Sequence, residues 1–304
     1  HGANRLSYGR CSQLLVQRFC RNNFSYSRYS KFKAEKYYPR RIKGGKEMNQ
    51  KQPLVRMENI QKRFGKVRAL KGVDFEVYDQ EVVGLLGDNG AGKSTLIKIL
   101  SGVYQPDGGT IYFQGEKVKI NSPEEARQLG IETVHQDLSL VEKMSVARNF
   151  FLGKELTKEV GFIEILDLTK MNYECMRGLK QVGVELRSPT EFVSTLSGGQ
   201  RQAIAIGRAV YFRARILILD EPLRNLSIRE QRTTLNHIQE ARNKGSSVIF
   251  ITHNVYHVCP IADRIVLLEN GEKLGEVKAG ELTPEEIAEC IATGKMIKEE
   301  RKNG

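Results

Sequence analysis

Five short apolar runs recur along the chain, each bounded by glycine or polar residues. They occupy residues 82–86, 131–134, 216–219, 248–251 and 265–268. Short apolar runs without polar alternation are typical of strands that are buried on both faces of a parallel sheet. Helical stretches and Gly-rich turns separate the runs, so the pattern predicts an α/β domain with a mostly parallel central sheet.

Other segments carry different patterns. Residues 70–78 and 110–119 alternate apolar and polar positions and predict antiparallel strands. Ser or Thr followed by Pro-Glu-Glu at 122–125 and 283–286 predicts two capped helix starts. Residues 137–196 carry no strong strand signal, so we expect a mostly helical subdomain inserted between two halves of the α/β domain.

The net charge of +12 is concentrated at one end of the chain. Residues 1–52 hold 13 basic and two acidic residues, whereas the other 252 residues hold 35 basic and 34 acidic ones. The nearly neutral remainder argues against a nucleic-acid partner. No apolar run approaches the ~18–20 residues that a membrane-spanning helix needs, so none is predicted.

Three interpretations compete for residues 1–52, which show no periodicity. The segment is rich in Arg and Ser and poor in acids, as in a transit peptide, whereas its short apolar run at 14–16 makes a secretory signal a weaker match. We favour a disordered or non-native extension, because the chain opens with His1 and Met48 follows a Gly-Gly-Lys-Glu stretch whose codons would resemble a ribosome-binding site. We therefore expect a folded domain over residues 53–295 and a charged tail over 296–304.

A Gly-rich loop joins the apolar run at 82–86 to a helical stretch. It matches G-x-x-x-x-G-K-[ST] and consists of Gly87, Asp88, Asn89, Gly90, Ala91, Gly92, Lys93 and Ser94, with Thr95 next in the same predicted ATP site. A strand before the loop and a helix after it are the context of a phosphate-binding loop. Its glycines let backbone N–H groups surround a β-phosphate, Lys93 would reach the β/γ oxygens, and Ser94 would bind Mg²⁺.

The apolar run at 216–219 ends in two acids, Asp220 and Glu221. Ligands of parallel sheets bind at the carboxyl ends of the strands. We expect Asp220 to hold Mg²⁺ through water and Glu221 to orient or deprotonate the attacking water. Two acids at a strand end are weak evidence alone, but the phosphate-binding loop upstream makes a catalytic role the better interpretation.

The pentapeptide Leu-Ser-Gly-Gly-Gln at 196–200 opens a predicted helix. The residues that can meet an anion at this helix start are Ser197, Gly198, Gly199 and Gln200. With this motif the chain resembles the ATP-binding cassette (ABC) family over about residues 53–295. The resemblance implies an ATP-hydrolysing P-loop NTPase with a mostly parallel sheet, an antiparallel β subdomain and the inserted α-helical subdomain.

The resemblance implies roles for three more residues. Gln136 matches the glutamine that contacts Mg²⁺ and responds to a membrane partner, and His253 matches the switch histidine that contacts the γ-phosphate. Phe64 matches the aromatic position that stacks on adenine, with a core phenylalanine as the alternative. One departure is Leu-Arg-Asn at 223–225, where sugar importers usually read Thr-Ala-Ala. That loop lies at the dimer interface in the family, so either Arg224 disturbs the coupling of two ATP sites or the change is a tolerated local variant.

In the family, each ATP lies between the phosphate-binding loop of one subunit and the Leu-Ser-Gly-Gly-Gln of another. The chain has one of each, so the resemblance implies a second cassette, most simply in a homodimer. Residues 122–138 and 151–155 resemble single-cassette ATPase subunits of ribose- or fructose-type importers. This implies monosaccharide import through a separate membrane permease, a solute-binding protein as an indirect partner, and a peripheral location on the cytoplasmic face of the cell membrane. Alternatives are an importer ATPase for a non-sugar solute and a soluble ABC ATPase acting on ribosomes or DNA.

Overall fold

The computed structural model describes residues 52–297, which are built around a six-stranded sheet. In spatial order its strands are β12 (Glu272–Lys278), β11 (Arg264–Glu269), β3 (Val82–Leu86), β10 (Ser247–Ile251), β9 (Ile216–Asp220) and β6 (Ile131–Val134). Five of them run parallel, and β12 pairs antiparallel with β11 at one edge. The five apolar runs therefore form the parallel strands, and the predicted α/β class is confirmed.

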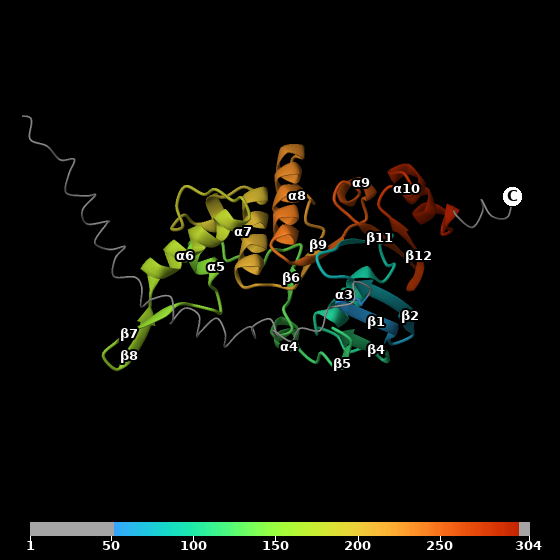
Figure 1. Cartoon of the computed structure of the whole chain (residues 1–304), viewed down its shortest axis with the longest axis horizontal. Helices are drawn as coiled ribbons and strands as arrows, with labels where there is room; N and C mark the ends of the chain where they lie inside the picture. The colour runs from blue at the N-terminus through green and yellow to red at the C-terminus, as the bar shows by residue number, and fades with distance from the viewer. Residues whose placement is uncertain (1–51, 298–304) are drawn as a thin grey trace, which may run out of the picture. The chain divides into compact units, whose positions relative to one another are not determined.

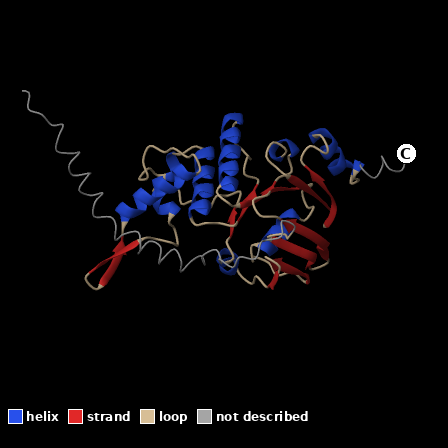
Figure 2. Ribbon diagram, in the orientation of Figure 1, coloured by secondary structure: helices blue, strands red, loops and turns tan. Residues whose placement is uncertain are grey.

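The parallel strands are mostly apolar because both faces of the sheet are covered. In β9, Leu217 and Leu219 pack into one core cluster, whereas Ile216 and Ile218 pack into the other. The first cluster includes residues of α5 (Val146–Phe150), α6 (Leu168–Gln181), α7 (Gly198–Tyr211), α8 (Ile228–Asn243), α9 (Val255–Val258) and α10 (Pro284–Thr293). The second includes residues of α3 (Lys93–Leu100) and α4 (Pro123–Gln128) and of a second, antiparallel sheet, as Figure 2 shows.

The antiparallel sheet has four strands, in the order β2, β1, β4 and β5. They are β1 (Val55–Phe64), β2 (Val67–Val77), β4 (Gly108–Phe113) and β5 (Glu116–Val118). The segment predicted as one strand over 110–119 is a hairpin, because the chain reverses at Gln114 and Gly115, with φ values of 53° and 82°. The apolar pattern missed β1, whose alternation is broken by register shifts around Asn59.

A second hairpin, β7 (Thr157–Val160) and β8 (Ile163–Leu166), interrupts the segment that was predicted to be mostly helical. It projects away from the helices in Figure 1 and carries exposed apolar side chains, including Val160 and Phe162. Helices α5 and α6 flank the hairpin in sequence, so the helical prediction is wrong for residues 157–166.

The two predicted capped helix starts are present. Thr283 and Glu286 form a reciprocal capping box at α10. At α4, the Ser122 hydroxyl accepts from the N–H of Glu125, but the Glu125 carboxylate accepts from the N–H of Asn121 instead of Ser122. The second cap is therefore displaced by one residue from the predicted pattern.

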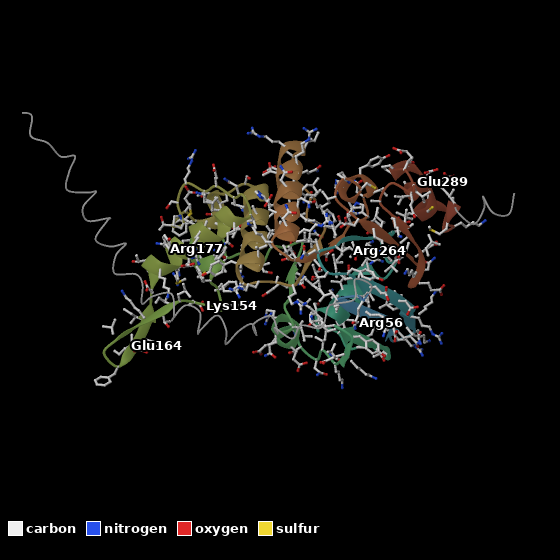
Figure 3. The ribbon with its side chains drawn as sticks, in the orientation of Figure 1. Arg56, Lys154, Glu164, Arg177, Arg264 and Glu289 are labelled. Carbon is white, nitrogen blue, oxygen red and sulfur yellow. The ribbon has the colours of Figure 1, made fainter. Side chains whose placement is uncertain are left out.

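A buried arginine joins the two sheets. Arg264 in β11 is 6% exposed, and its guanidinium donates to the Glu81 carboxylate (2.8 and 3.1 Å) and to the backbone carbonyl of Glu76 (2.8 Å). Figure 3 labels Arg264 where β11 approaches the antiparallel sheet. Because a buried charge without partners is strongly destabilising, this network fixes the two sheets against each other.

The predicted N-terminal extension and most of the predicted charged tail lie outside the described residues, because residues 1–51 and 298–304 are not described. Between residues 52 and 297, no helix is both long and apolar enough to span a bilayer.

We expect Phe250→Ala to lower the free energy of unfolding by about 3–5 kcal/mol, because Phe250 is fully buried in β10. The same change at the fully exposed Phe162 provides the matched control. It should change the free energy of unfolding by less than about 0.5 kcal/mol. Urea unfolding followed by circular dichroism measures both variants. Equal losses would contradict the assignment of β10 to the core and of the β7–β8 hairpin to the surface.

Candidate nucleotide-binding site

The predicted site residues are gathered by neighbouring strands of the parallel sheet. Strand β10 lies between β3 and β9, and its residue Ile251 is in register with Leu85 of one and Asp220 of the other. The segments that follow these three strands therefore leave the sheet at the same edge. The phosphate-binding loop follows β3, Glu221 follows β9, and His253 lies just after β10.

The glycines of the phosphate-binding loop are required by close packing on one side. A Cβ atom at Gly87 would lie 2.1 Å from the carbonyl oxygen of Leu268, and one at Gly92 would lie 2.8 Å from Leu70 Cδ2. Gly90 also has a positive φ of 87°, but no atom lies within 4 Å of where its Cβ would stand. The loop is thus held against β11 at Gly87 and against β2 at Gly92, and it is open at Gly90, where a ligand can approach the backbone.

The N-terminus of α3 differs from those of the other described α-helices. Side chains cap α4 to α10, whereas Gly92 precedes α3 with no side-chain hydrogen bond. The first-turn N–H groups of α3 therefore keep donors for an anionic ligand. Ser94 is exposed and Thr95 is half-buried in this turn, and both hydroxyls belong to the same end of the helix.

Lys93 is 8% exposed, and its ammonium donates to the carbonyl oxygens of Gly87 (2.5 Å) and Asp88 (3.0 Å). Burial lowers the pKa of Lys93, and the negative charges of Glu221, Asp88 and Asp220 oppose this shift. A cation held in a poorly solvated site gains from an anionic ligand, because the ligand replaces lost hydration.

The two carboxylates after β9 have different surroundings. Burial, and then the charge of Glu221, raise the pKa of Asp220. The Glu221 carboxylate accepts hydrogen bonds from the Thr252 hydroxyl (3.0 Å) and the His253 N–H (3.0 Å), and it lies 2.6 Å from His253 Nδ1. The structure therefore brings together Glu221 and His253, which are 32 residues apart in the chain.

Several contributions at this site differ from those expected. Gln136 is exposed just beyond the end of β6, next to β9. His135, to which the sequence motifs assign no role, lowers the pKa of Asp220 through its charge. Only the fold could reveal this effect of His135, because β6 and β9 are neighbours through tertiary pairing.

Phe64 is 42% exposed, which excludes the core alternative, and its ring packs edge-to-face on Tyr104 with centroids 5.2 Å apart.

The Ser-Gly-Gly-Gln turn lies elsewhere, at the start of α7. Ser197 and Gln200 form a capping box, and the N–H of Gly199 donates to Glu230 of α8 at 3.2 Å. A Cβ at Gly198 would lie 2.9 Å from Leu226. The turn is thus packed against the start of α8, and Figure 1 shows α7 well separated from α3.

The departure at 223–225 is accommodated without crowding. Leu223 is buried, whereas the Arg224 side chain is exposed. Asn225 has a φ of 61°, a conformation that asparagine tolerates better than alanine. The N–H of Arg224 donates to the Glu221 carbonyl oxygen at 3.1 Å, so the loop continues directly from the catalytic candidate.

Comparison with known proteins supplies the family. The ABC transporter family model matches residues 70–224, which include the phosphate-binding loop, Glu221 and the Ser-Gly-Gly-Gln turn. The chain is also 43% identical over 240 residues to the xylose/arabinose import ATP-binding protein of Sulfolobus acidocaldarius, covering 79% of this chain and 94% of that protein. The chain belongs to the ABC transporter family.

Other relatives agree with this assignment. The ABC protein is 40% identical to the fructose import ATP-binding protein of Rhizobium meliloti, covering 73% of this chain and 87% of that one. A ribose import ATP-binding protein of Rubrobacter xylanophilus is 42% identical over 75% of this chain, which spans only 44% of that protein.

Solved structures give the same fold. An ATP-binding cassette of an ABC transporter in its ADP conformation matches with a TM-score of 0.69 and 26% identity, covering 81% of this chain and 98% of that one. A nucleotide-free cassette matches with a TM-score of 0.67 and 26% identity, covering 76% of this chain and 93% of that one. The protein is therefore an ATP-binding ATPase with the P-loop NTPase fold, as predicted.

The packing of the loop can be tested on its glycines. Gly87→Ala and Gly90→Ala both place a side chain at positive φ, which destabilises by about 1–2 kcal/mol. Gly87→Ala also forces a Cβ against Leu268, so we expect its loss in unfolding free energy to exceed that of Gly90→Ala by at least about 1 kcal/mol. Urea unfolding of the nucleotide-free variants measures the difference. Equal losses would contradict the contact between the loop and β11.

Proposed function

We propose that this ABC protein is the ATPase subunit of an importer for a monosaccharide. The observation that carries the ATPase mechanism is the convergence of Lys93 and the Glu221–His253 pair on one edge of the parallel sheet. Support for the sugar comes from the printed functions of its relatives, two of which match over most of their own length. We further propose that residues 53–295 form the ATPase domain, with the segment around 137–196 as a subdomain that includes the β7–β8 hairpin.

The geometry supports the following proposed roles for the site residues. Lys93 and the open backbone of residues 87–92 would hold the β- and γ-phosphates, and Ser94 and Thr95 lie at the same helix end. The exposed ring of Phe64 is available to stack on adenine. Glu221, held by Thr252 and His253, is oriented to accept a proton from water, while His253 would contact the γ-phosphate.

The donors at this edge suit a magnesium ion. The Ser94 hydroxyl, the Asp220 carboxylate and the Gln136 amide are hard oxygen donors of the kind that Mg²⁺ prefers. Asp220 in particular gains from a nearby cation, because burial and Glu221 disfavour its charge. When bound, Mg²⁺ would neutralise charge on the phosphate oxygens.

A second cassette would complete each site. The Ser-Gly-Gly-Gln turn packs against α8, apart from the phosphate-binding loop of the same chain. Its contact with a nucleotide therefore requires another subunit, and a two-fold homodimer supplies two equivalent sites. The permease would be a separate membrane protein docked at the cytoplasmic face of the cell membrane, with a solute-binding protein as an indirect partner. Gln136, exposed beyond β6, would respond to the permease.

We expect Glu221→Gln to bind ATP normally and to hydrolyse it at least about 100-fold more slowly, because glutamine cannot take a proton from water. The unhydrolysed ATP should hold two subunits together, so a dimer should accumulate with Mg·ATP. Gel filtration and a phosphate-release assay measure the two effects.

Lys93→Ala serves as the control in the same assays. It should neither bind ATP productively nor form the dimer. Hydrolysis by Glu221→Gln at the wild-type rate would exclude Glu221 as the group that activates water, and hydrolysis by Lys93→Ala would exclude the loop assignment.

The importer itself can be tested with the full chain reconstituted in vesicles with its permease and solute-binding protein. We expect a cognate monosaccharide to raise ATP hydrolysis several-fold above the rate without sugar, whereas an amino acid should not. Stimulation by a non-sugar solute alone would reject the sugar assignment while leaving the ATPase mechanism intact.

A further inference from the structure

The start of α7 already holds an anion that belongs to the same chain. One carboxylate oxygen of Glu230, Oε1, accepts from the N–H of Gly199 at 3.2 Å. The other, Oε2, accepts from the N–H (3.0 Å) and hydroxyl (2.7 Å) of Ser227. A single carboxylate therefore joins the first turn of α7 to the first turn of α8, two helices that lie side by side in Figure 1.

The packing around this carboxylate is close. A Cβ at Gly199 would lie 3.1 Å from both Cβ and Cγ of Glu230, so the glycine allows the Glu230 side chain to lie directly on the turn. Hydrogen bonds from Ser227, Ser197 and Gly199 lower the pKa of Glu230 to about 2. The side chain is therefore an anion throughout the physiological range.

We propose that Glu230 is an internal occupant of the Ser-Gly-Gly-Gln turn, which the terminal phosphate of the partner subunit's ATP must displace before the dimer closes. This inference rests on the proposed ATP-driven dimer. Two anions cannot share the Gly199 N–H and the positive end of the α7 dipole without strong repulsion. The charge of Glu230 thus opposes closure until a nucleotide outcompetes it.

The release needs only a small movement. Oε2 can stay on Ser227, where Glu230 completes the capping box of α8, while rotation of the carboxyl group frees Gly199. The two arrangements share the two hydrogen bonds at Ser227 and differ in those from Gly199 and Ser197. Glu230 therefore sets how much ATP is needed to close the dimer, without touching the phosphate-binding loop.

The test uses Glu230→Gln in the Glu221→Gln protein, with dimer formation followed by analytical ultracentrifugation over a series of Mg·ATP concentrations. Removing the negative charge should lower the ATP concentration at half-dimerisation by about tenfold. This ratio is expected when the charged hydrogen bond from Gly199 to Glu230 no longer competes with the phosphate. Glu230→Ala should shift it in the same direction. Circular dichroism and urea unfolding establish that both variants are folded.

Glu286→Gln is the matched control, because Glu286 has the same capping-box role at α10, far along the chain from the Ser-Gly-Gly-Gln turn. It should leave the half-dimerisation concentration within about twofold of the Glu221→Gln protein. An unchanged or higher value for Glu230→Gln would overturn the proposal and would favour a purely positioning role for Glu230. Failure of the Glu221→Gln protein itself to dimerise with ATP would instead reject the proposed dimer, and this inference with it.

Discussion

The buried positive charge of Lys93 is the constraint around which the nucleotide site is organised. Its hydrogen bonds go to two carbonyl oxygens of its own loop, and the opposing charges are the carboxylates of Glu221 and Asp220 at the end of β9 and of Asp88 in the loop. Burial disfavours the charge, which lowers the pKa of Lys93. A polyanion such as a nucleoside triphosphate compensates for the hydration that the buried ammonium of Lys93 has lost. The site is therefore arranged for a ligand that the chain itself does not provide.

The parallel sheet converts residues that are distant in sequence into this site. Because β10 lies between β3 and β9, the phosphate-binding loop, Glu221 and His253 all emerge at one edge. The chain that leaves β9 after Glu221 also forms the loop at 223–226, which leads to Ser227 and Glu230 at the start of α8. A continuous stretch of chain thus links Glu221, which we propose activates water in one site, to the turn that we propose serves the other site. This stretch would be a physical basis for coupling between the two sites.

The parallel strands could be predicted because each is apolar on both faces, and the site because its motifs follow those strands. The β7–β8 hairpin could not, because its apolar residues, such as Phe162, are exposed and give no periodic signal of burial. The alternation of β1 is broken at Asn59, which has a φ of 49°. The capping pattern of Ser227 and Glu230 is visible in the sequence, but the bond from Gly199 to Glu230 depends on how α7 and α8 pack. The charge of His135 near Asp220 depends likewise on the pairing of β6 with β9.

The central position of β3 has a consequence for synthesis. The N–H of Val82, at the start of this strand, donates to Asp263, 181 residues later. At ~5–20 residues per second, a ribosome needs roughly 10–40 s to make that intervening stretch. For most of this interval the apolar run at 82–86 has neither of its neighbouring strands, β10 and β11, to pair with. The nascent chain therefore exposes an apolar segment to which chaperones can bind.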